Sequence, residues 1–187
     1  MLIRILCACL VLALCGSGSA LSCRWMDQKF RQHSESCLQL IHTMANSSAN
    51  STEDVELQVE EEVAFPERLY SQASKASDQD KLAFIGQVLK EVAALFEEDH
   101  SSASWEESVV ENFLHVVTRQ ADELLSCVMS AAVTLSGREP AEEGRPAAAV
   151  LQQTEPHSAE GWELIRNQVR AHLLRVDQLA ASVLRNN

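Results

Sequence analysis

Histidines are the side chains of this sequence with the widest catalytic and metal-binding range, and there are six of them, at positions 33, 42, 100, 115, 157 and 172. Zinc ligands on one helix face are commonly four residues apart, whereas His33 and His42 are nine apart. The sequence also lacks a nucleophile elbow and a phosphate-binding loop. His172 falls near the apolar side of a predicted helix, where a hydrogen-bonded core histidine is a commoner role than a catalytic base. We therefore expect no enzyme activity, no metal site and no cofactor.

Six cysteines are the other reactive groups, and three of them lie within the first 22 residues. The remaining three are Cys23, Cys37 and Cys127. In an oxidising compartment two of these would pair and one would be left over. A bridge from Cys23 to Cys127 would close a loop of about 100 residues, for which the chain-entropy model gives roughly 4–5 kcal/mol. Cys37 falls within a predicted helix, either as a buried small hydrophobe or as a free reactive thiol.

The N-terminal residues have the three-part pattern of a secretory signal peptide. One arginine precedes an uninterrupted apolar run, residues 5–15, and small residues follow it. Cleavage after Ser22 fits the small-x-small rule, and cleavage after Ala20 fits nearly as well. The apolar run is too short to span a bilayer. We expect residues 1–22 to be removed and residues 23–187 to form a secreted, extracellular domain.

Two glycosylation sequons begin at Asn46 and Asn50, within a polar stretch that is predicted to be a surface loop. The chain of 187 residues has 27 acidic and 15 basic side chains, a formal charge of −12 that would repel the phosphate backbone of a nucleic acid. Only 5% of the residues are aromatic, and six Gly and four Pro provide few turn signals for an all-β fold. The composition favours helices, with neither a nucleic-acid partner nor membrane insertion.

Four stretches carry apolar residues at spacings of three and four, which is the pattern of an amphipathic helix. The stretch 24–45 has Met26, Phe30, Cys37, Ile41 and Met44 at its apolar positions, and the stretch 77–96 has Leu82, Ile85, Leu89, Val92 and Phe96. The stretch 104–128 has Val110, Leu114, Val117, Ala121, Leu124 and Val128. The stretch 158–183 has Trp162, Ile165, Val169, Val176, Leu179 and Val183. Ser77 and Asp80 approximate a capping box. Four such helices joined in part by long loops predict an all-α helical bundle with crossover connections.

Two further segments are shorter or less regular. Residues 65–70 are consistent with a short turn of helix that has Pro66 at its first position. Residues 129–156 contain Gly137, Pro140, Gly144 and further breakers, which exclude one continuous helix there. We interpret residues 129–156 as a loop or a poorly ordered insertion.

Several stretches resemble the type I interferons, in particular the ray-finned fish group with two cysteines in the mature chain. The residues that carry the resemblance are 23–26 (CRWM), 50–54 (NSTED), 64–66 (AFP), 69–76 (LYSQASKA), 97–106 (EEDHSSASWE) and 157–166 (HSAEGWELIR). The resemblance covers roughly residues 1–128 and 157–187. It implies a long-chain helical cytokine of the up-up-down-down type, and a secreted antiviral ligand for a two-chain receptor of the class II cytokine receptor family, with intracellular kinase signalling and antiviral gene induction.

The family pattern also implies roles for individual residues. It pairs Cys23 with Cys127 and leaves Cys37 extra, so that a monomer is expected and Cys37 is a possible route to disulfide dimers. It places Arg166, Asn167 and Arg170 on the receptor-binding side of the last helix. Residues 129–156 depart from the family, which has a basic amphipathic helix there, and an altered reading frame or alternative exon is one hypothesis for the change.

Two other functions remain open at this point. A ligand with an altered fourth segment would bind one receptor chain without recruiting the other and so would not signal. A secreted lipid-binding helical protein is the second alternative, because amphipathic helices also lie on lipid. The acidic polar faces and the expected disulfide bridge of a compact bundle favour the cytokine.

Overall fold

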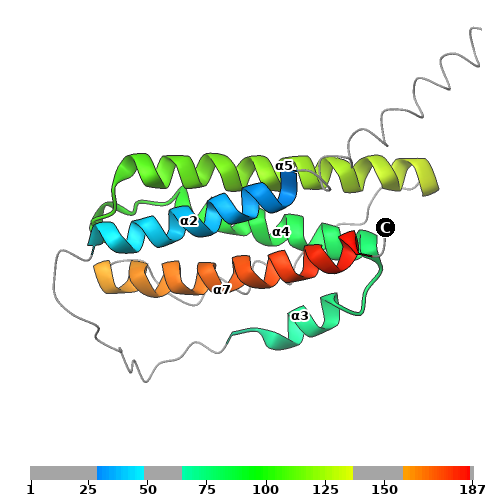
Figure 1. Ribbon diagram of the computed structural model, residues 1–187, viewed down its shortest axis with the longest axis horizontal. Helices are drawn as coiled ribbons and strands as arrows, with labels where there is room; N and C mark the ends of the chain where they lie inside the picture. Colours follow the sequence, from blue (N-terminus) through cyan, green and yellow to red (C-terminus); the bar gives the residue numbers. More distant parts are fainter. Residues whose placement is uncertain (1–28, 49–64, 137–157, 186–187) are drawn as a thin grey trace, which may run out of the picture.

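The computed structural model describes residues 29–48, 65–136 and 158–185, which fold into helices with no strand among them (Figure 1). The elements are α2 (Arg31–Ser48), α3 (Glu67–Ala73), α4 (Asp78–Phe96), the 3-10 turn η2 (Ser101–Ala103), α5 (Glu107–Ser136) and α7 (Ala159–Leu184). The predicted all-α class is therefore confirmed. Residues 1–22, Cys23 and Asn50 lie outside the described residues.

The four long helices form a bundle in which α2 and α4 each pack against both α5 and α7. The helices α5 and α7 consequently occupy opposite corners, and Figure 1 shows them on opposite sides of α2 and α4. The short helix α3 contacts α4 and reaches α7 through side-chain contacts. The outward faces of α5 and α7 thus point in different directions from one shared core.

The apolar seams predicted from periodicity form that core. On α7 the six predicted positions, Trp162, Ile165, Val169, Val176, Leu179 and Val183, are all buried. On α4 the buried set includes Ile85, Leu89, Val92 and Phe96, while Leu82 packs against the core from a half-buried position. Burying such side chains contributes about 1.5–3 kcal/mol each relative to full exposure, which offsets the entropy lost on ordering the helices.

Two predicted helix starts are confirmed and one is wrong. The hydroxyl of Ser77 accepts a hydrogen bond from Asp80 N at 3.2 Å, and that of Ser158 accepts one from Gly161 N at 3.1 Å. Ser104, expected to begin the third long helix, instead closes η2 with a left-handed backbone, φ 55°. The third long helix begins at Glu107, three residues later.

Two helices end later than predicted. The helix α5 continues to Ser136, so the irregular segment predicted to start at residue 129 was wrong for residues 129–136. That stretch contains no Gly or Pro, and Gly137 follows directly as a helix stop signal. The remainder of the 129–156 segment lies outside the described residues. Likewise α2 runs to Ser48, so Asn46 lies in its last turn and not in a loop.

Candidate functional site

The outward face of α7 carries a continuous stripe of exposed residues spaced by three and four. It consists of Leu164, Asn167, Arg170, Leu174 and Gln178, and is called the α7 stripe below. Leu164 and Leu174 are 37% and 39% exposed, which is unusual for side chains of their size in this structure. They flank the predicted receptor-binding residues Asn167 and Arg170. An apolar pair around polar groups is the composition of a protein-binding surface.

Arg166 is buried, unlike Asn167 and Arg170, the other two residues that are predicted to bind the receptor. Its side chain is buried, with the residue only 8% exposed. The guanidinium donates to Glu163 Oε2 at 2.8 Å and to the Ile41 carbonyl at 3.5 Å, and its Nη2 donates to Asn167 Oδ1 at 3.1 Å. Arg166 therefore ties α7 to α2 and orients Asn167, while Asn167 and Arg170 are the residues of the predicted trio that face outward.

Glu163 connects this arrangement to the start of α5. Its Oε1 accepts a hydrogen bond from Trp105 Nε1 at 2.8 Å, while its Oε2 holds Arg166. Trp105 stacks on Phe96 with ring centroids 5.7 Å apart and meets Trp162 edge-on at 5.7 Å. A charged hydrogen bond on a rigid aromatic cluster fixes the first turns of α7, and with them the base of the α7 stripe.

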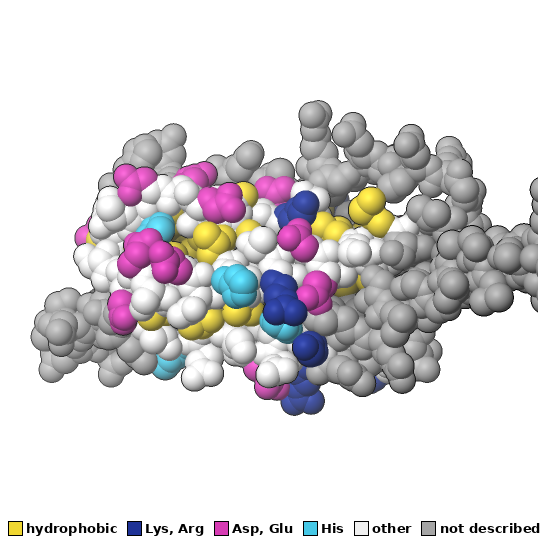
Figure 2. Space-filling model, turned by 90° about the horizontal axis from the view of Figure 1, so that it is seen from above, with side chains coloured by type: hydrophobic (Ala, Val, Ile, Leu, Met, Phe, Trp, Pro, Cys, Tyr) yellow, Lys and Arg dark blue, Asp and Glu magenta, His cyan; other side chains and the backbone are white. Residues whose placement is uncertain are grey.

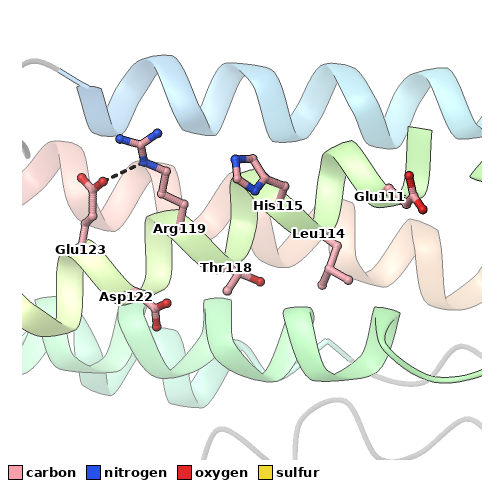
Figure 3. Close-up of a pocket in the computed structure, with 7 residues that line it drawn as sticks. All are labelled: Glu111, Leu114, His115, Thr118, Arg119, Asp122 and Glu123. Carbon is pink, nitrogen blue, oxygen red and sulfur yellow. Dashed lines mark hydrogen bonds and ion pairs between the residues drawn. The ribbon is translucent and has the colours of Figure 1, made fainter. Parts of the chain in front are cut away.

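The outward face of α5 carries the second candidate surface. An open hollow of about 500 Å³, called the α5 hollow below, is lined by Glu111, Leu114, His115, Thr118, Arg119, Asp122 and Glu123 (Figure 3). Glu111, His115, Arg119 and Glu123 follow one another at intervals of four residues and extend along the α2 side of the helix. Arg119 Nε donates to Glu123 Oε1 at 2.8 Å.

A histidine from the neighbouring helix joins the α5 hollow at its edge. Burial lowers the pKa of His33 on α2, and the charges of Arg119 and Lys29 lower it further, while Glu123 opposes them. Figure 2, which looks onto the α5 side, shows histidine and basic side chains near the middle, with acidic side chains both beside them and toward the left end. Mixed charges at such a face suit a polar protein partner better than an apolar ligand.

His172 lies in the core, as predicted, and not in a catalytic site. It is 1% exposed, and its Nδ1 is hydrogen-bonded to the Tyr70 hydroxyl at 2.8 Å. The ring of Phe65 covers it, with centroids 4.7 Å apart. Burial lowers the pKa of His172 to about 4, so the imidazole is neutral at physiological pH. This neutral hydrogen bond joins α3 to α7.

The two described cysteines are both buried, and they differ in their bonding. Cys127 on α5 is disulfide-bonded. Its predicted partner Cys23 lies outside the described residues, so the Cys23–Cys127 pairing stays a prediction. Cys37 is free and 0% exposed, with its Sγ 3.9 Å from Gln120 Oε1, and burial raises the pKa of its thiol to about 12. Of the two roles considered for Cys37, the buried small hydrophobe is the one observed.

The described residues contain neither a metal-binding cluster nor a membrane-spanning helix. No group of three His, Cys, Asp or Glu side chains there is placed to hold a metal ion. No helix among these residues has the length and hydropathy needed to cross a membrane.

The burial of Arg166 and the α5 hollow were not predicted from the sequence, although a residue spacing indicates each of them. Arg166 lies four residues after Trp162 and three before Val169, both of which are in the buried seam. That register indicates an inward position. The α5 hollow was signalled by the four-residue repeat from Glu111 to Glu123, although its hollowed shape depends on side-chain packing.

Comparisons with known proteins agree with the helical fold. The family model of the Interferon alpha/beta domain matches residues 26–183. Interferon a3 of Oncorhynchus mykiss is 29% identical over 177 residues, which are 94% of this chain and 95% of that protein. The structure of zebrafish interferon 1 is similar with a TM-score of 0.66 at 26% identity, covering 86% of this chain and 99% of that one. The chain therefore belongs to the interferon alpha/beta family, whose members are helical cytokines and not enzymes.

Proposed function

We propose that this interferon is a secreted ligand that engages the two chains of a class II cytokine receptor with opposite faces of its bundle. Juxtaposed receptor tails then start intracellular kinase signalling and antiviral gene induction, with no chemistry performed by the ligand. The observation that carries the proposal is the diagonal placement of α5 and α7, which presents the α5 hollow and the α7 stripe on different sides of one core.

The α7 stripe supports the proposal through its composition. Leu164 and Leu174 supply apolar contact area, and the Arg170 guanidinium is suited to a partner carboxylate because of its planar fork. Asn167 is held by Arg166, so less side-chain entropy is lost when a partner binds it. In this proposal Asn167 and Arg170 contact the receptor and Arg166 positions Asn167.

The remaining parts of the proposal concern the mature molecule. Residues 1–22 are removed as a leader, and Cys23 bridges Cys127 in a two-cysteine framework. Asn46 and Asn50 carry glycans. The buried thiol of Cys37 is unavailable for cross-linking in the folded chain, which supports a monomer without disulfide dimers.

The test is a dose response of purified, oxidised residues 23–187 on receptor-bearing cells, read as antiviral gene induction and as receptor binding. Arg170→Glu is expected to weaken binding by at least about tenfold, because it reverses a central charge of the α7 stripe. Lys90→Glu is the matched control, since it makes the same charge change at an exposed site of α4. It should bind and signal like the unaltered protein.

Other outcomes would assign a different function. Receptor binding without gene induction at saturating dose would identify a non-signalling variant. Strong vesicle binding with a gain in helicity, and no receptor-dependent response, would identify a lipid-binding protein. The structure argues against the latter, because the apolar seams are buried in the bundle core and Met129, Leu164 and Leu174 are the large hydrophobic side chains exposed within the described residues.

A further inference from the structure

We propose that the α5 hollow and the adjoining side of α2 form an acid-sensitive contact, which holds a basic surface of a receptor chain at neutral pH and releases it at endosomal pH. The inference rests on the proposed function and adds regulation by pH to one of the two proposed receptor contacts. Its structural basis is the pair of histidines, His33 and His115, that two neighbouring helices bring to one charged cluster.

The charges around these histidines are nearly balanced. His33 lies on α2 and Lys29 lies just before that helix, and Glu111, His115, Arg119, Asp122 and Glu123 come from α5. Arg119 is paired with Glu123 at 2.8 Å, whereas Glu111 and Asp122 form no ion pair with the described residues. With neutral histidines, carboxylates outnumber the cations of this cluster. A positive charge on His33 would cancel that excess.

The cluster indicates the charge of its partner at neutral pH. The carboxylates of Glu111 and Asp122 line an open hollow and are available to lysine or arginine side chains of a protein surface. The formal charge of −12 on the whole chain would also steer a basic surface toward it. The partner committed to here is therefore a receptor ectodomain that presents Lys or Arg to the α5 hollow.

Acidification changes the cluster because histidine is the side chain that ordinarily titrates between pH 5 and 8. His115 lies one turn from Glu111 on one side and one turn from Arg119 on the other. His33 feels the positive charges of Arg119, Lys29 and a protonated His115. A basic partner adds to that repulsion, so partner and protons compete, and by linkage each weakens binding of the other.

The experiment measures the dissociation constant of the purified ectodomain of each receptor chain at about pH 7.4 and about pH 5.5. For the chain that binds the α5 hollow, acidification should weaken binding to the unaltered protein on the order of tenfold. His33→Gln/His115→Gln should reduce this ratio to about two or less. His42→Gln, which removes an exposed histidine of α2 outside the cluster, should keep the full ratio.

Two further variants locate the contact and guard against misfolding. Glu111→Gln/Asp122→Asn should weaken binding of the same receptor chain at pH 7.4 without affecting the chain that binds the α7 stripe. The single variant His115→Gln alters an exposed side chain and should lower the ratio of the dissociation constants at the two pH values part of the way. Near-ultraviolet circular dichroism at both pH values confirms that each protein is folded when measured.

The outcomes separate this inference from the function on which it rests. Two results overturn the acid-sensitive contact and leave receptor binding intact. One is binding that is equally tight at both pH values, and the other is a ratio of the dissociation constants at the two pH values that is unchanged in the double histidine variant. Binding of the same chain that is unaffected by Glu111→Gln/Asp122→Asn overturns the location. Absence of binding by either receptor chain at pH 7.4 overturns both proposals.

Discussion

The Tyr70 hydroxyl and the Nδ1 atom of His172 lie 2.8 Å apart, although 102 residues separate them in the chain. Phe65 stacks on the Tyr70 ring and lies tilted against the His172 ring, and Arg175 lies over Phe65 while its guanidinium pairs with Glu67. This cluster fastens α3 to α7. A neutral imidazole is required, because the contacts around it supply no carboxylate for a buried cation.

Folding stability should consequently fall as the pH drops. The pKa of His172 is lowered by burial from 6.5 to about 4, so the unfolded chain binds a proton that the folded chain resists. Its contribution is complete above about pH 6.5, declines from there toward pH 4 and reaches up to roughly 3 kcal/mol. Urea unfolding at pH values from 7.5 to 4 measures this slope.

A matched variant isolates His172 from the other titrating groups. His172→Gln keeps a polar partner for Tyr70 and removes the ionisable ring, so its stability should depend less on pH in that window. His33→Gln should have a smaller effect, because His33 is half-buried on the surface. An unaltered slope in His172→Gln would show that another group controls the acid response.

Cys37 should be unreactive toward thiol reagents in the native protein. The thiol is fully buried and its pKa is raised to about 12, so both access and thiolate formation are suppressed. A chromogenic disulfide reagent is expected to label less than about one tenth of Cys37 within an hour in buffer, and all of it in urea. Rapid labelling of the folded, oxidised monomer would contradict the burial of Cys37 and reopen the route to dimers.

The sequence predicts the buried core more completely than the surfaces, and the reason is physical. Trp162 and Val169 belong to a seam whose spacing follows from helix geometry, so their burial follows from the sequence alone. Arg166 lies within the same seam, yet its partners Glu163 and Ile41 depend on how α2 docks against α7. Family resemblance singled out one turn of the helix and could not separate the buried Arg166 from the outward-facing Asn167 and Arg170.

The ends of α5 were also predicted wrongly, because of the residues near each end. The glycines and prolines between residues 137 and 156 dominated the composition of the whole 129–156 segment. Residues 129–136 have none of these breakers and extend α5. At the other end of α5, Ser104 has a capping side chain, but its left-handed backbone is incompatible with an N-cap.

Gly86 should be intolerant of a side chain where α4 packs on α5. A Cβ atom there would lie 2.6 Å from Leu125 Cδ2 and 2.7 Å from Leu125 Cγ. Gly86→Ala gains about 1 kcal/mol of helix propensity, but overpacking costs about 1–3 kcal/mol, so we expect a net loss of about 1 kcal/mol. Thermal unfolding of a double-mutant cycle with Leu125→Ala should reveal a coupling that relieves the loss. Additive effects would show that the two helices are further apart.

Arg166 and Arg170 should respond oppositely to alanine substitution. Removing Arg166 leaves Glu163 without its cation and frees Asn167, so Arg166→Ala should lower the free energy of unfolding by about 2 kcal/mol. Arg170→Ala removes an exposed side chain and should change stability by less than about 0.5 kcal/mol while weakening receptor binding. Arg166→Lys keeps the charge without the planar fork and should recover only part of the stability. Urea unfolding and receptor binding are measured on all three proteins. A stable Arg166→Ala that loses binding as strongly as Arg170→Ala would show that Arg166 contacts the receptor directly, because a positioning residue acts on binding only through the structure that it holds.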